Sequence, residues 1–90
     1  MSYKDVPPMS RRAVGSTLVT LGDKAYLVST VRLLHPDYPH LPYETAIFKD
    51  SGHGDVTGPT YQHTDEETAI HRHGEIVQSI IRGEVKLEGF

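Results

Sequence analysis

The segment Tyr61–His73 carries the strongest constraint on the fold, because it marks where a helix begins. Thr64 has a hydroxyl that can cap the first backbone N–H groups. Glu67, three residues later, can reach back to the N–H of Thr64, and the pair predicts a capping box. The three acidic residues that follow Thr64 also place negative charge at the positive end of the helix dipole. We therefore expect one helix over about 65–82.

Apolar residues recur at three- and four-residue steps through this helix, which predicts one buried face. Gly83 is the expected C-terminal stop. His73 falls on the buried face, so we expect a buried histidine with one ring nitrogen bonded to a backbone carbonyl or a tyrosine. The expected face consists of Ile70, His73, Val77, Ile80 and Ile81, widened by Ala69 and Ile76.

β-branched and alternating segments before the helix predict strands, and the turn at Gly22 joins the first two into a hairpin. The tail with Val85 and Leu87 is either a last edge strand or a pin for Phe90. The predicted fold class is α+β, an antiparallel sheet of three to four strands with one C-terminal helix packed on one face. Residues 1–12 are expected to be a flexible lead before a single domain over 13–90. The expected strands are Ala13–Leu21, Ala25–Leu34, Tyr43–Phe48 and Thr60–His63.

Composition narrows the class of protein. Ninety residues make one domain, and the lack of cysteine excludes disulfides and thiolate metal sites. No apolar run approaches a membrane span, and the first residues lack the apolar core of a secretory signal, so we expect a cytoplasmic protein. The net charge of −3 argues against nucleic-acid binding. Binding through the basic residues of the first half stays an alternative; these are Lys4, Arg11, Arg12, Lys24 and Arg32.

Six histidines raise the question of a metal site or an enzyme. His63, His71 and His73 are the nearest group, but His71 and His73 are two residues apart on a helix and face opposite ways. Zinc needs three or four converging ligands, so we expect neither metal nor cofactor. No nucleophile elbow or thiol is present, so we assign no catalytic residue. A small metal-dependent enzyme using these histidines remains the alternative.

The segment His35–Pro42 is the candidate binding loop. Three prolines restrict its backbone, and tyrosine offers contact area with few torsions to immobilise. We assign Asp37, Tyr38 and Tyr43 to partner binding. The equally weighted alternative is that Tyr38 and Tyr43 only cover the small core.

Three motifs in order resemble a group of small bacteriophage proteins. They are Ser29-Thr-Val-Arg-Leu-Leu-His35, Tyr43-Glu-Thr-Ala-Ile-Phe48, and Tyr61-x-x-Thr-Asp-Glu-Glu-x-Ala69 followed by His73 and Val77. This chain departs from the family at Arg72, where glycine is usual, and in its proline-rich loop. The resemblance implies a phage or prophage origin and action in the host cytoplasm. It implies no reaction.

The sequence therefore predicts a small phage accessory protein that acts by binding a host or phage protein. An inhibitor of a host defence system, of the anti-CRISPR type, is one specific form. The edge strand of so small a sheet also leaves a homodimer open.

Overall fold

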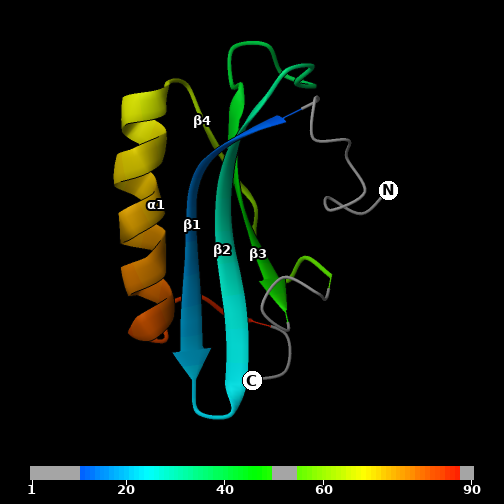
Figure 1. The fold of residues 1–90 in the computed structure, drawn as a ribbon. Helices are drawn as coiled ribbons and strands as arrows, with labels where there is room; N and C mark the ends of the chain where they lie inside the picture. The colour runs from blue at the N-terminus through cyan, green and yellow to red at the C-terminus, as the bar shows by residue number, and fades with distance from the viewer. Residues whose placement is uncertain (1–10, 50–54, 88–90) are drawn as a thin grey trace.

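The computed structural model describes residues 11–49 and 55–87. Within them the chain forms a four-stranded antiparallel sheet in the order β1-β2-β3-β4, with one helix, α1, after the last strand (Figure 1). This confirms the predicted α+β class. The first strand begins two residues earlier than expected, and residues 1–10 lie outside the described part. The elements are β1 Arg11–Leu21, β2 Lys24–Leu33, β3 Tyr43–Lys49, β4 Tyr61–His63 and α1 Glu66–Ile81.

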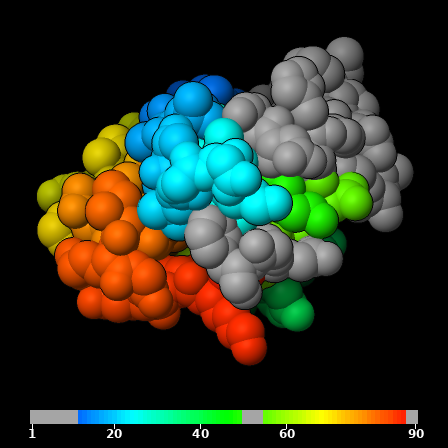
Figure 2. Space-filling view, turned by 90° about the horizontal axis from the view of Figure 1, so that it is seen from below, coloured from blue at the N-terminus to red at the C-terminus, as the bar shows by residue number. Residues whose placement is uncertain are grey.

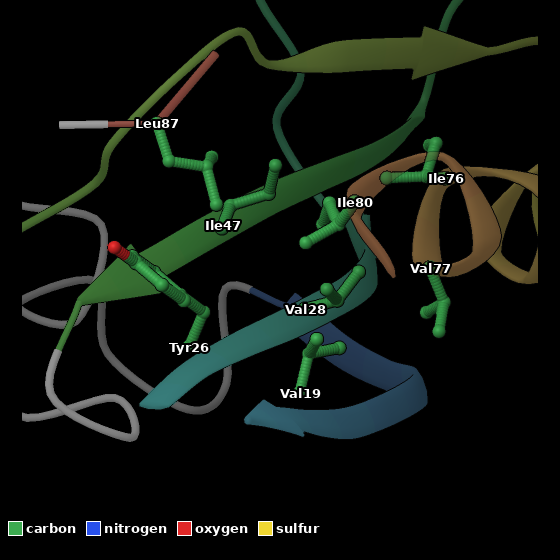
Figure 3. Packing of buried hydrophobic residues seen from close by; sticks show 8 residues of the cluster. All are labelled: Val19, Tyr26, Val28, Ile47, Ile76, Val77, Ile80 and Leu87. Atoms are coloured by element: carbon green, nitrogen blue, oxygen red, sulfur yellow. The ribbon is translucent and has the colours of Figure 1, made fainter. Parts of the chain in front are cut away.

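The helix lies along one face of the sheet and seals an apolar cluster against it. Figure 3 shows Val28 and Ile47 pointing from the sheet towards Ile80 of the helix. Alternation along the strands brings every second residue to this face. The cluster comprises Val19, Tyr26, Val28, Ile47, Ile76, Val77, Ile80 and Leu87.

The buried face of α1 is rotated from the predicted one. Ile70 and Ile81 are 57% and 53% exposed, although both were expected in the core. The buried helix residues are instead Ala69, Ile76, Val77 and Ile80. Six apolar residues are spread around this helix, so their spacing alone fits more than one rotation about its axis.

The N-terminal cap is also one residue later than predicted. Asp65 is the N-cap, with extended backbone, and its side chain accepts a hydrogen bond from the Thr68 N–H at 2.7 Å. This bond holds the pKa of Asp65 below its usual value. The Thr64 hydroxyl instead donates to Asp65 Oδ2 at 3.3 Å. The predicted capping box of Thr64 and Glu67 is therefore wrong, because Asp65 is the N-cap and the Thr64 hydroxyl bonds the Asp65 carboxylate, not a backbone N–H.

Replacing Asp65 by alanine should lower the free energy of unfolding by about 1 kcal/mol, the usual cost of a lost helix cap. Replacing Thr64 by alanine should change it by no more than about 0.5 kcal/mol, as for an exposed side chain outside the cap. Urea titrations of the two variants and the parent protein measure both values. An Asp65→Ala loss no larger than the Thr64→Ala loss would remove Asp65 from the cap.

Gly83 ends the helix, as predicted, in the left-handed conformation with φ of 74°. The segment after it forms no strand within the described residues. Leu87 of this segment packs into the apolar cluster and is only 3% exposed. Phe90, the other residue expected to contact the core, lies outside the described part. Figure 2 shows this segment continuing from α1 at the same end of the molecule as the β1–β2 turn. The described helix is too short and too polar to cross a membrane.

Candidate functional site

Five polar side chains lie in the interface between α1 and the sheet, one from each element. Thr17, Thr30, Thr45 and His63 come from β1 to β4 in order, and His73 comes from the middle of α1. The strand register produces this row, because Thr30 lies directly opposite Thr45. We call these five residues the Thr–His chain.

The members of the Thr–His chain are joined by four hydrogen bonds. His73 bonds through both ring nitrogens: Nε2 lies 2.8 Å from the Thr17 hydroxyl and Nδ1 lies 2.7 Å from the Thr30 hydroxyl. The Thr30 and Thr45 hydroxyls are 2.6 Å apart, and Thr45 lies 2.9 Å from His63 Nε2. Both inner threonines are 0% exposed and His63 is 4% exposed. The Thr–His chain thus gives hydrogen-bond partners to polar atoms that the helix would otherwise bury without any.

The number of donors and acceptors decides which protonation states the Thr–His chain accommodates. A neutral imidazole donates through one nitrogen and accepts through the other, and each hydroxyl donates once. With both histidines neutral, all four hydrogen bonds form in either of two arrangements. In one, each group donates to its neighbour on the Thr17 side, and in the other, each donates to its neighbour on the His63 side. One added proton on either histidine is also accommodated. With both histidines protonated, Thr30 and Thr45 each accept from an imidazolium, and one of the two hydroxyls loses its acceptor.

Electrostatics favour the neutral form of both histidines. Burial lowers the pKa of His63, and the positive charge of Arg72 and the neighbouring His73 lower it further. Burial alone lowers the pKa of His73. Since an unperturbed histidine titrates near pH 6.5, both rings are neutral at pH 7.

The arrangement differs from the predicted role of His73 in its bonding partners. His73 is half-buried, and both of its nitrogens bond threonine hydroxyls, not a backbone carbonyl or a tyrosine. The ring lies above Gly15 of β1, where a Cβ would come within 3.5 Å of it. Sequence reasoning missed Thr17, Thr30 and Thr45, whose only signal was their common face in the expected strands.

The three histidines proposed for the metal alternative do not share one point. His71 lies on the outer side of α1, with Nε2 3.8 Å from a Glu75 carboxylate oxygen. His63 and His73 are separated by the two inner threonine hydroxyls. Within the described residues no three histidine or carboxylate side chains are grouped as metal ligands require.

The hydrogen bonds of His73 have the spacing of a catalytic triad, with Thr17 in the place of the nucleophile, His73 as the base and Thr30 as the group that orients it. The orienting group is a neutral hydroxyl, which stabilises an imidazolium far less than a carboxylate does. Neither of two hollows on the described surface reaches these residues. One, of about 550 Å³, lies between the β1–β2 turn and the tail, and the other lies on the outer side of α1.

The candidate binding loop, predicted at His35–Pro42, spans 34–42 between β2 and β3 and is held in a defined shape at the opposite end of the sheet from the β1–β2 turn (Figure 1). The Leu33 N–H donates to the Pro42 carbonyl at 2.8 Å, which closes its base, and the Leu41 N–H donates to the Tyr38 carbonyl at 2.8 Å. The Tyr38 ring is 54% exposed and meets His40 edge-on at 6.3 Å. The loop therefore presents an exposed aromatic ring on a fixed backbone.

The other two residues assigned to binding have different surroundings. Tyr43 is only 8% exposed and lies in the first position of β3, so its ring is not a contact surface and that assignment is corrected. The alternation of β3 turns this side chain inward, since Tyr43 and Thr45 share the helix face. Asp37 is exposed. The pKa of the half-buried Glu44 is raised mainly by its burial and further by the negative charge of Asp37.

No protein-family model, curated protein or solved structure matches this chain. Among the described residues, function can be argued from two places. The Thr–His chain is an inner network whose nitrogens and hydroxyls bond one another. The loop over 34–42 offers its side chains to the outside.

Proposed function

We propose that this protein is a small phage-encoded accessory protein that acts by binding another protein through the loop over 34–42. The observation that carries the proposal is the exposed Tyr38 ring on a loop closed by two backbone hydrogen bonds. Such a loop loses little conformational entropy on binding, because prolines and internal bonds have already fixed its shape. Tyrosine is among the residues most enriched at the energetic centres of interfaces.

The surroundings of Tyr38 extend this contact surface. Leu34, at the start of the loop, is 52% exposed and adds apolar area. Asp37 and Glu44 place two carboxylates near each other at the loop base, and burial and repulsion raise the pKa of Glu44. A positively charged group on the partner would relieve that repulsion. We therefore propose a partner whose docking surface combines an apolar pocket for Tyr38 with a nearby lysine or arginine.

The three phage-like motifs support a partner in an infected host cell, either a host protein or a phage protein. An inhibitor of a host defence system of the anti-CRISPR type is the specific form that we propose. In that form, expression of the protein in a CRISPR-immune host restores plaque formation by the targeted phage.

The test compares three full-length baits in lysate from infected host cells: the parent protein, Tyr38→Ala and Ile81→Ala. Ile81 is the matched control, since it is 53% exposed and lies at the end of α1. The parent and Ile81→Ala should retain one partner, and Tyr38→Ala should lose it by about tenfold or more, as for a central interface residue. Equal retention by all three baits, or no partner above background, would contradict the proposal.

A further inference from the structure

The two edges of the sheet differ in a way that points to a second interaction surface. On one side β4 is only three residues long, and the segment before it covers the rest of β3. There Val56 bridges to Phe48, and the Thr57 N–H donates to the Ile47 carbonyl at 2.8 Å. On the other side β1 is eleven residues long, and no described strand pairs with its outer edge.

Beyond its first residues, the outer edge of β1 lacks the features that normally keep edge strands apart. Proteins block such edges with lysine, proline or bulges, because their N–H and C=O groups can pair with another strand. Over Ala13–Leu21 there is no charged residue and no proline. The register shift between Ala13 and Gly15 is the single irregularity in its pairing with β2. The regular part of the strand is therefore Gly15–Leu21.

The middle residue of this regular part is Leu18, which is 57% exposed. In the sheet register Leu18 lies opposite Leu27, and Leu27 lies opposite Phe48. This apolar row crosses the face of the sheet away from α1, where Phe48 is 4% exposed, and it stops at the outer edge of β1. A strand added there with an apolar residue beside Leu18 would continue the row.

We propose that two copies of this chain pair antiparallel along Gly15–Leu21, about a two-fold axis at Leu18, and form one continuous eight-stranded sheet. The regular segment extends three residues to either side of Leu18, so self-pairing about Leu18 matches the two regular segments from end to end. In this register Leu18 lies beside the partner's Leu18, and both helices cover the same face of the joined sheet. A second copy is favoured over a foreign peptide because one symmetric contact satisfies both exposed edges. The contact is separate from the loop over 34–42.

The first test is the molar mass by light scattering after size-exclusion chromatography, across a concentration series. The parent protein should approach twice its 10.0 kDa chain mass. Leu18→Lys should raise the dissociation constant on the order of tenfold or more, because like charges would lie opposite each other. Ile70→Lys is the control, since Ile70 is also 57% exposed but lies on α1. A parent protein that stays at the chain mass at all concentrations would overturn the proposal.

The second test does not depend on a charged substitution. The chain has no cysteine, so a Leu18→Cys variant carries a single thiol. Opposite residues of antiparallel strands have Cα atoms about 4.5–5.5 Å apart, within disulfide range. Mild oxidation should therefore convert Leu18→Cys to a covalent dimer much faster than Ile70→Cys. Equal rates for the two variants would also overturn the proposal.

Discussion

Replacing Thr45 by valine should lower the free energy of unfolding by about 3 kcal/mol, within the range for two buried polar groups that lose a partner. Valine fills nearly the same space, so the loss comes from hydrogen bonding and not from a cavity. The Thr45 hydroxyl bonds both Thr30 and His63, and all three side chains are buried. Without the Thr45 hydroxyl, both His63 Nε2 and the Thr30 hydroxyl lose a hydrogen-bond partner.

Urea titration of Thr45→Val measures this loss, and two further variants separate its causes. Thr20→Val makes the same chemical change at an exposed position of β1, so its effect should stay within about 0.5 kcal/mol. Thr45→Ser keeps the hydroxyl and should recover most of the loss. Equal stability of Thr45→Val and the parent protein would show that the Thr–His chain contributes nothing to the fold.

Stability should also fall as the pH is lowered from 7.5 to 5.5. The pKa values of His63 and His73 are lowered in the folded protein, mainly by burial. In the unfolded chain both return to about 6.5, so below that pH the unfolded state binds more protons than the folded state. The stabilisation is complete above the unfolded pKa and is lost as the pH falls through the folded values.

Urea midpoints at several pH values between 7.5 and 5.5 test this direction. The raised pKa of Glu44 acts the opposite way, because the folded state then binds the extra proton. Glu44→Gln removes that contribution, and in this background the fall in stability should be steeper. A midpoint that rises as the pH falls in Glu44→Gln would contradict the lowered pKa values of His63 and His73.

The sequence predicted the strands and the helix well, because their signals are local. β-branched density, the Gly22 turn and Gly83 each act within a few residues, and the structure has the expected elements there. The rotation of α1 about its own axis was not fixed by such local signals. Thr64 and Asp65 are both good caps, and apolar residues lie at both Ile70 and Ala69. Packing against the sheet, which buries Ala69, decides between the two rotations.

The Thr–His chain needed information that no short segment carries. Thr30 and Thr45 meet because the loop between β2 and β3 sets the register, and a shift of one residue would turn Thr45 to the other face. His73 could be placed near the core from its helix position, but its two threonine partners lie more than forty residues away in sequence. The prolines placed Tyr38 in a loop but left open whether its ring is exposed or covers the core, and the burial of Tyr43 depended on strand alternation.

The central claim is that His63 and His73 are neutral structural members of one hydrogen-bonded chain, which leaves binding to the outer surface. Long-range ¹H–¹⁵N NMR of the imidazole nitrogens over a pH titration tests it most directly, with the urea-unfolded chain as the reference. We expect both rings to be mainly neutral at pH 7, to titrate below their unfolded values, and to affect each other's titration as a coupled pair. An imidazolium at either position at pH 7, or two independent titrations at the unfolded values, would contradict the claim.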